Sequence, residues 1–236
     1  MNQLMIMAVF AALLPVGLLF YFIYSQDKKN PEPPRWLWRG VLYGVLSVFV
    51  SLSITSAFSG IAVEFSFLKG TAFGAVLDAL FNAALPEEAA KLFMIWLLLR
   101  NNPYFDEKID GIVYATCVGL GFAGIENILY LANNLDNLVQ VAVTRALFSV
   151  PGHFFFAVTM GYYISLSCFS RCSAEQRKNY RLLAYFIPVL LHWAFDAILM
   201  VSDAVPYISG ALTVVFIVFV IFVKNQATAK IQNLKA

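Results

Sequence analysis

Long apolar stretches follow one another along the chain, separated by short segments that carry most of the charge. A helix needs about 20 apolar residues to cross the hydrocarbon core of a bilayer. By that length the pattern predicts an all-α fold, a polytopic membrane helix bundle with about seven transmembrane helices. We expect the spans at about residues 4–24, 38–58, 72–100, 110–132, 143–170, 181–201 and 207–223.

The composition supports this reading. Hydrophobic residues make up 61% of the 236 residues and charged residues only 13%, whereas a water-soluble domain of this length would expose far more charge. The first apolar stretch follows Met1, Asn2 and Gln3 without a positive charge, so we interpret it as a span and not as a cleaved signal peptide. The net charge of +2 is too small to indicate a nucleic-acid partner.

Basic residues gather in alternate connections between the predicted spans. Those after the first, third and fifth spans and in the tail are Lys28, Lys29, Arg35, Arg39, Arg100, Lys108, Arg171, Arg177, Lys178, Arg181, Lys224, Lys230 and Lys235. Because basic loops stay on the cytoplasmic side, this pattern predicts an N-terminus outside and a C-terminus in the cytoplasm.

We expect residues 1–236 to form a single integral-membrane domain. Within it, residues 1–70 would hold the N-terminal helices and a proline-rich linker, and residues 71–203 a core that carries the ionisable side chains. Residues 204–236 would supply a last, lipid-facing helix and a solvated basic tail. Disulfides are not expected, because the three cysteines lie within spans or at a cytoplasmic helix end, and two thiols on one helix face make an incomplete metal site.

Several ionisable residues interrupt the apolar stretches, where each costs about 2.5–3.5 kcal/mol unless it faces protein or water. They come from four predicted spans and comprise Glu87, Glu88, Lys91, Glu126, His153, His192 and Asp196, with the amide of Asn127 beside Glu126. At about 1.5 Å per helical residue, their depths in the bilayer overlap. We therefore expect them to meet in one polar cavity that opens to the outer side.

The spacing within each helix suggests chemistry. Lys91 follows Glu88 by three residues and Glu87 by four, so it can pair with either and leave the other carboxylate freer to accept a proton. With a histidine nearby, that carboxylate could activate water for attack on a peptide carbonyl. His192 and Asp196 share a helix face and could stabilise the resulting oxyanion.

Prolines predict a kink or a break in the helix before the glutamates and a break before His153. Pro86 directly precedes the two glutamates, and Pro151 with Gly152 precedes His153. Proline removes one helical hydrogen bond and disfavours helix at the preceding residue. Asp78 and Arg145 fit no motif, and we expect them to form a structural pair or to lie at the membrane interface.

Four motifs together resemble the PrsW family of intramembrane proteases, a family related to the type II CAAX prenyl endopeptidase and Abi superfamily. They are E-E-x-x-K at Glu87 to Lys91, I-E-N at Ile125 to Asn127, His153, and H-x-x-x-D at His192 to Asp196. The resemblance covers roughly Asp78 to Asp203. CAAX relatives usually have E-E-x-x-x-R and often H-x-x-x-N. Lys91 and Asp196 match the PrsW motifs instead, which argues against a prenyl-protein substrate.

The resemblance implies a glutamate-dependent endopeptidase of the bacterial inner (plasma) membrane, a family described in places as metalloproteases. It implies contact with membrane lipid and a substrate that is a membrane-anchored protein. One such substrate would be a single-span anti-sigma factor, whose cleavage is the first step of a signalling pathway. In that family pattern Glu87 matches the water-activating glutamate and His153 the partner base. The remaining matches are Glu88 and Lys91 as support, His192 and Asp196 as the oxyanion or metal-binding pair, and Glu126 and Asn127 as structural residues.

The participation of a divalent metal such as zinc stays open at this point. If a metal binds, Glu87, His153, His192 and Asp196 are its candidate ligands. The chain has no H-E-x-x-H motif, which places two ligands and a base on one helix, so we rank metal-independent chemistry ahead.

Two functions of other classes compete with the protease. A proton- or ion-coupled transporter also needs acids and histidines within its spans, although no inverted repeat of the kind that transporters often show is visible here. A non-catalytic immunity or binding protein on the same scaffold is the third alternative.

Overall fold

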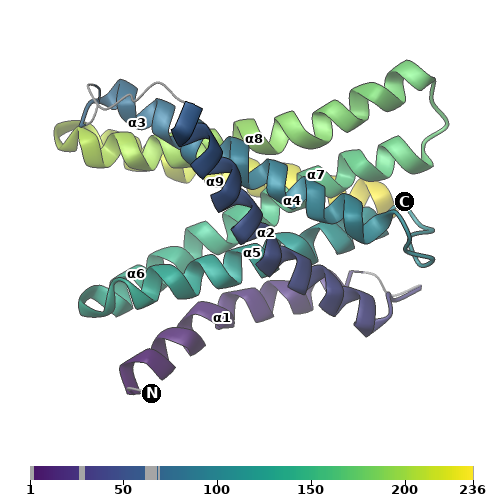
Figure 1. Ribbon diagram of the computed structural model, residues 1–236, viewed down its shortest axis with the longest axis horizontal. Helices are drawn as coiled ribbons and strands as arrows, with labels where there is room; N and C mark the ends of the chain where they lie inside the picture. The colour runs from purple at the N-terminus through teal and green to yellow at the C-terminus, as the bar shows by residue number, and fades with distance from the viewer. Residues whose placement is uncertain (1–2, 27–29, 62–67, 69, 236) are drawn as a thin grey trace.

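The chain folds as a bundle of helices (Figure 1). The computed structural model describes residues 3–26, 30–61, 68 and 70–235, and no strand occurs among them. The α-helices are α1 Gln3–Tyr24, α2 Pro34–Ile61, α3 Ala72–Asp78, α4 Leu85–Leu99, α5 Asp110–Ala132, α6 Leu138–Thr144, α7 Val150–Phe169, α8 Ala174–Ala204 and α9 Ser209–Lys235. The predicted all-α membrane bundle is confirmed.

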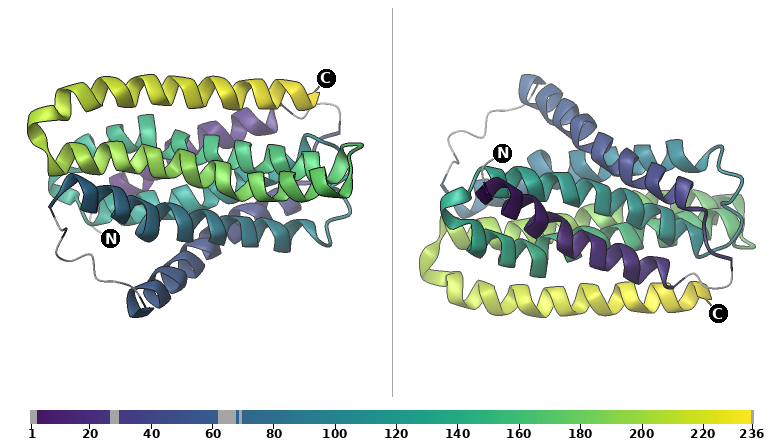
Figure 2. Two further views of the ribbon diagram at one scale, coloured as in Figure 1. Left: turned by 90° about the horizontal axis from the view of Figure 1, so that it is seen from above. Right: turned by 90° about the horizontal axis from the view of Figure 1, so that it is seen from below.

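Six helical segments of the described chain are long and apolar enough to cross a membrane. They are Ile6–Tyr24, Pro34–Ala57, Asp110–Ala132, Leu135–Phe169, Ala174–Ala204 and Pro206–Leu234. The other predicted span is built from α3, the π-helical segment η2 (Ala79–Ala84) and α4, which follow one another without a gap. Together they run from one end of the bundle to the other (Figure 2), so the chain passes along the bundle seven times.

Helix α5 forms the centre of the bundle. It packs against α1, α2 and α7, and 78% of its span is buried, against 22% for the span in α1 and 11% for the span in α9. Helix α9 lies on the outside against α7 and α8. The large exposed apolar side chains of α9 match the lipid-facing role expected for the last span.

Helices α2 and α5 cross at close range through two glycines. A Cβ atom on Gly44 would overlap the carbonyl oxygen of Val118, and one on Gly121 would overlap that of Val41. Small residues let helix backbones approach in this way within membranes. Beyond the crossing, α2 diverges from the rest of the bundle (Figure 2).

The expected solvated tail is instead the end of a long helix, because α9 continues to Lys235. Val223, Ala227 and Ile231 recur every four residues and therefore lie on one helix face. All three are buried, and Ala227 and Ile231 join the main core cluster. The sequence did not predict this helical continuation, because polar residues interrupt the apolar stripe.

The linker between α1 and α2 is anchored to the bundle by Glu32. This side chain is 3% exposed and accepts a hydrogen bond from the hydroxyl of Tyr114 in α5. The sequence predicted only an extended connector at this position. Lys28 and Lys29, which contributed to the predicted orientation, lie outside the described residues.

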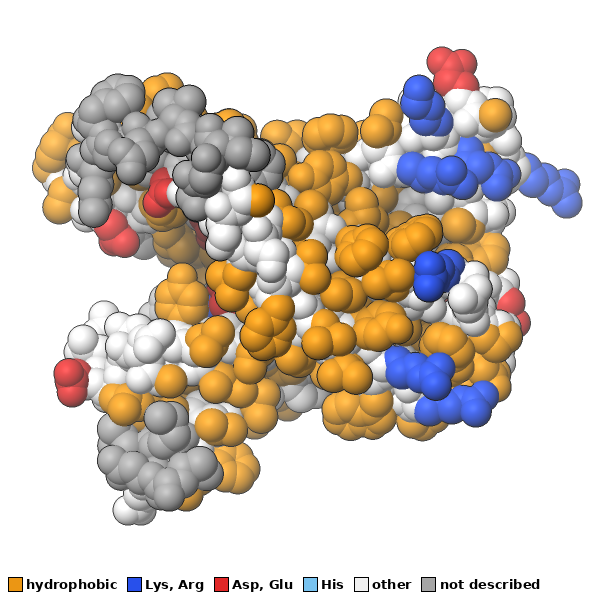
Figure 3. All heavy atoms as spheres, viewed as in Figure 1, with side chains coloured by type: hydrophobic (Ala, Val, Ile, Leu, Met, Phe, Trp, Pro, Cys, Tyr) orange, Lys and Arg blue, Asp and Glu red, His pale blue; other side chains and the backbone are white. Residues whose placement is uncertain are grey.

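The two ends of the bundle differ in charge. On the face in Figure 3, Lys and Arg side chains gather at the end where the α1–α2, α4–α5 and α7–α8 connections lie. A hollow opens at the opposite end, and acidic side chains appear at its rim and inside it. By the positive-inside rule, the basic end is the one expected in the cytoplasm and the hollow is expected to face outward.

Candidate active site

Two prolines shape the helices that carry the site. The π-helical segments η2 (Ala79–Ala84) and η4 (Arg145–Ser149) each end two residues before a proline. In both, the residue before the proline donates its N–H to the carbonyl five residues back, which widens the turn. The chain therefore stays helical through both segments, where the sequence predicted a kink or a break at Pro86 and a break at Pro151.

The lysine of the cluster lies at its centre. The Nζ atom of Lys91 is 2.9 Å from Oε1 of Glu88, 3.4 Å from Oε2 of Glu87 and 3.1 Å from Nδ1 of His153. It also lies 3.9 Å from the ring centroid of Phe122. Lys91 is 2% exposed, so these contacts replace the water that an ammonium would otherwise hold.

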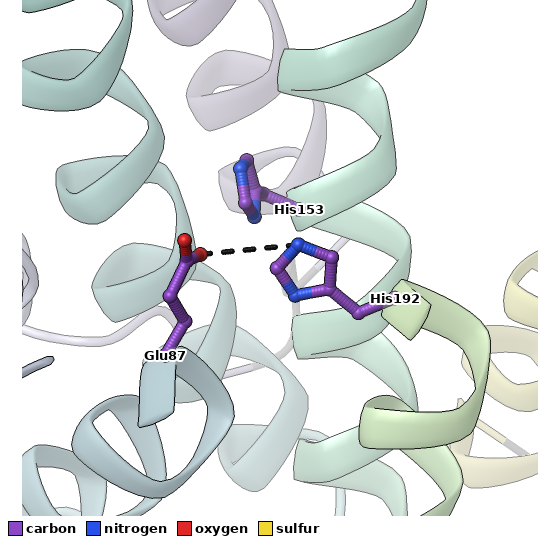
Figure 4. A group of neighbouring side chains, drawn as sticks. All are labelled: Glu87, His153 and His192. Atoms are coloured by element: carbon purple, nitrogen blue, oxygen red, sulfur yellow. Dashed lines mark ion pairs between the residues drawn. The ribbon is translucent and has the colours of Figure 1, made fainter. Parts of the chain in front are cut away.

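His192 brings α8 to the glutamate pair. Its Nδ1 atom lies 2.9 Å from Oε1 of Glu88, and its Nε2 atom lies 3.1 Å from Oδ2 of Asp196 and 3.9 Å from Oε2 of Glu87. The ring stacks on Phe156 at a centroid distance of 5.1 Å. Figure 4 shows Glu87 pointing across the site toward the two histidines.

His153 in α7 is bonded through both ring nitrogens. Nδ1 faces the Lys91 ammonium at 3.1 Å, and Nε2 lies 2.8 Å from Oε2 of Glu126. An ammonium has only donors, so Nδ1 must be the acceptor. We therefore assign the proton to Nε2, from which it is donated to Glu126.

Arg145 is a member of the site that the sequence analysis did not identify. Its NH2 atom lies 2.8 Å from Oε2 of Glu126, and its Nε atom donates to Oδ1 of Asn127 at 2.7 Å. The expected pair with Asp78 is not formed, because Asp78 accepts a hydrogen bond from Asn82 instead. One signal was available: Glu126 was an intramembrane acid without an assigned counter-charge, and Arg145 was a basic residue without a role.

The exposed fractions distinguish the acids. The Glu88 side chain is 1% exposed, whereas those of Glu87, Glu126 and Asp196 are 15%, 19% and 23% exposed. Water can therefore reach Glu87, while Glu88 is enclosed between Lys91 and His192. The second oxygen of Glu88 has no hydrogen-bond partner among the described residues.

The donor set fits a divalent cation in composition and charge. Glu87, His153 and His192 each offer one ligand atom within 4.8 Å of the others, and carboxylate oxygen and imidazole nitrogen are zinc ligands. The four acids of the cluster outnumber its two fixed cations, Lys91 and Arg145, by two charges. Asp196, the fourth predicted ligand, contacts the same Nε2 atom of His192 that faces Glu87. Glu88 contacts Nδ1 of that ring, as an outer carboxylate does in many metal sites.

The predicted convergence of the cluster is confirmed. Residues from α4, α5, α7 and α8 share one continuous network in which Lys91, His153 and His192 link the acids. Asn127 lies at its edge, where it also donates to the carbonyl oxygen of Ala12 in α1.

Fold and site together define a multi-pass membrane protein with a buried glutamate and histidine centre. The sequence model of the PrsW family, described as PrsW family intramembrane metalloprotease, matches residues 32–223. The chain therefore belongs to the PrsW family of intramembrane proteases.

Its similarity to curated members extends over most of each chain. Protease PrsW of Geobacillus kaustophilus is 35% identical over 195 residues, which cover 83% of this chain and 80% of that protein. The Clostridioides difficile protein of that name is 36% identical, covering 81% and 78%, and the Bacillus subtilis one is 34% identical, covering 78% of each. No solved structure matches this chain.

Proposed function

We propose that this protein is an endopeptidase of the bacterial plasma membrane that hydrolyses a peptide bond in a membrane-anchored protein. The observation that carries the proposal is the geometry at Glu87. This carboxylate is partly exposed and faces two histidines from other helices. Its contacts with charged neighbours are long, because Oε2 lies 3.4 Å from Nζ of Lys91 and 3.9 Å from Nε2 of His192. Membership of a protease family supports hydrolysis over transport.

In this mechanism Glu87 is the general base. It removes a proton from a water molecule, whose oxygen then bonds to the carbonyl carbon of the substrate. The C–N bond breaks as the nitrogen receives the proton that Glu87 carried, giving a free carboxylate and an amine. Glu88 keeps Lys91 and His192 in place, because its Oε1 atom contacts both at 2.9 Å.

The histidines have different tasks. Nε2 of His192 lies 3.9 Å from Oε2 of Glu87 and 3.1 Å from Oδ2 of Asp196. Its N–H can donate to the oxyanion that forms on the attacked carbonyl when it turns from Asp196 to the substrate. Glu88 orients the ring through Nδ1 at 2.9 Å. His153 acts as the partner base implied by the family pattern only when its contact with Lys91 opens, because both its nitrogens are engaged.

A divalent cation such as zinc would be held by Glu87, His153 and His192. When bound, it would supply polarisation of the substrate carbonyl and acidification of a water molecule. Its entry would require the Lys91 ammonium to move away from Nδ1 of His153. The Lys91 position therefore favours metal-independent chemistry, as the absence of H-E-x-x-H also did.

The substrate class follows from where the site opens. The hollow lies at the end of the bundle opposite the basic one (Figure 3). The positive-inside rule makes this the outer end, so we expect cleavage at or near the outer membrane border. A single-span protein resembling an anti-sigma factor fits, with cleavage here as the first step of a signal. Its helix must unwind locally, since a hydrogen-bonded helix hides its carbonyls.

The test compares the membrane proteomes of cells that carry the wild-type protein or the Glu87→Gln variant. We expect one single-span protein to accumulate uncut with the variant, because the amide cannot accept the proton. Glu175→Gln, an exposed change at the start of α8, is the matched control. Glu88→Gln and His153→Ala should also stop cleavage of that protein.

Two results would overturn parts of this proposal. Unchanged cleavage by all three site variants, in protein that inserts normally, would remove the enzymatic function, and solute flux dependent on the same residues would point to a transporter. Cleavage that a chelator stops and zinc restores would replace the metal-free mechanism with a metal-dependent one.

A further inference from the structure

A second feature of the bundle lies outside the site. A groove of about 960 Å³ opens between α4, α7 and α8 on the cytoplasmic half. Its α4 wall runs from Ala89 to Arg100, which at about 1.5 Å per residue spans roughly 16 Å. That length matches one leaflet of a bilayer whose hydrocarbon core is about 30 Å thick.

The groove is apolar along its depth and basic at its mouth. Leu92, Phe93 and Trp96 line the α4 wall, and Phe93 and Trp96 are 46% and 54% exposed. Arg100 on α4 and Arg181 on α8 lie on opposite walls toward the cytoplasm. Neither arginine forms an ion pair with another described residue.

We propose that this groove binds an anionic phospholipid of the cytoplasmic leaflet. An acyl chain would lie along the α4 wall, and Arg100 and Arg181 would hold the phosphate. Arginine matches the geometry of phosphate oxygens, and the cytoplasmic leaflet is the one that carries anionic lipids.

The positive charge at the mouth of the groove favours a phospholipid over a substrate helix as its occupant. Transmembrane helices carry an excess of Lys and Arg at their cytoplasmic ends. Two unpaired arginines would repel such an end and attract a phosphate. Tyr185 lines the groove and donates its hydroxyl proton to the carbonyl oxygen of Leu85 at 3.1 Å.

Native mass spectrometry of the detergent-solubilised protein tests the proposal. The protein is mixed with equal amounts of phosphatidylglycerol and phosphatidylcholine, and the adducts are counted. We expect wild type to retain phosphatidylglycerol preferentially. The Arg100→Gln/Arg181→Gln double variant should lose that preference by roughly 30-fold, since each of the two basic residues contributes on the order of 1 kcal/mol.

The matched control removes two basic residues from the same end without touching the groove. Arg171→Gln/Lys178→Gln changes two exposed side chains there and should keep the preference. Leu92→Trp should weaken phosphatidylglycerol binding although both arginines remain, because the larger ring fills the path of the acyl chain.

Three outcomes would overturn the proposal: equal retention of the two lipids by wild type, an equal loss in both double variants, or full binding by Leu92→Trp. Each variant is first checked for the wild-type elution volume in size-exclusion chromatography, and a variant that fails is replaced by its single changes.

Discussion

At the centre of the site, the Lys91 ammonium is the fixed cation that separates Glu87, Glu88 and His153. The sequence predicted that lysine pairs with the glutamates, because three- and four-residue spacings place them on one helix face. It could not predict the contact with His153, which comes from another helix 62 residues away in sequence. Nor could the spacing predict which glutamate is the more exposed, because the exposure of Glu88 depends on its enclosure by α8.

Lys91→Met is expected to destabilise the protein by about 3–5 kcal/mol, because it leaves the buried Glu88 carboxylate without its principal counter-charge. Thermal unfolding in detergent measures the effect as a lower midpoint. Lys178→Met, a change at an exposed position, is the control. An unaltered midpoint for Lys91→Met would show that His192 alone compensates Glu88.

The ion pair between Glu126 and Arg145 was not predicted from the sequence. Both were visible as charges within or beside a span. A charged group at that depth needs a partner, and pairing the two leftover charges would have found this contact. The interaction with His153 could not be predicted, because it depends on how α5 and α7 are rotated about their axes.

At the scale of elements, each π-helical segment precedes a proline, and Glu87, Glu88 and His153 lie within the first turn after those prolines. The prolines predicted irregular helix at both places. The sequence did not indicate how the lost hydrogen bond is replaced, because a break, a kink and a wider turn all satisfy the same constraint. The choice is made by packing, since η2 lies against α8.

Pro86→Ala is expected to reduce cleavage by about 10- to 100-fold while leaving stability unchanged or slightly higher. The new N–H can complete an α-helical bond, so η2 can close to a regular turn and rotate Glu87 away from His192. A displacement of about 1 Å can cost that much in rate. Pro206→Ala, before α9, is the control proline.

Cleavage of the accumulated single-span protein in membranes gives the rate for each variant, and thermal unfolding gives the stability. Equal rates for Pro86→Ala and wild type would mean that the wide turn in η2 does not position Glu87.

Helix boundaries show the same division between what sequence did and did not predict. The span at residues 110–132 agrees with α5, because charged or polar segments border it on both sides. The predicted end at 223 falls short of the end of α9, because Lys224, Asn225 and Gln226 conceal the buried stripe that continues beyond them. Composition alone therefore locates a span but not the full helix.

For the whole molecule, the alternating direction of the passes explains why residues far apart in sequence reach one depth. That depth could be predicted from sequence at a fixed rise per residue. The inward rotation of each helix and the groove between α4, α7 and α8 could not, because they depend on the packing of side chains around α5. The direction of the outer hollow depends on the orientation of the entire bundle.

Cysteine labelling tests this orientation. In protein with serine at Cys117, Cys168 and Cys172, a cysteine introduced at Asp136 should react with a membrane-impermeant maleimide in intact cells. One at Lys178 should react only after permeabilisation, because the basic end faces the cytoplasm. Both positions are exposed at opposite ends of the bundle. The reverse pattern would turn the end of the bundle with the hollow toward the cytoplasm, and cleavage at the outer border would then be excluded.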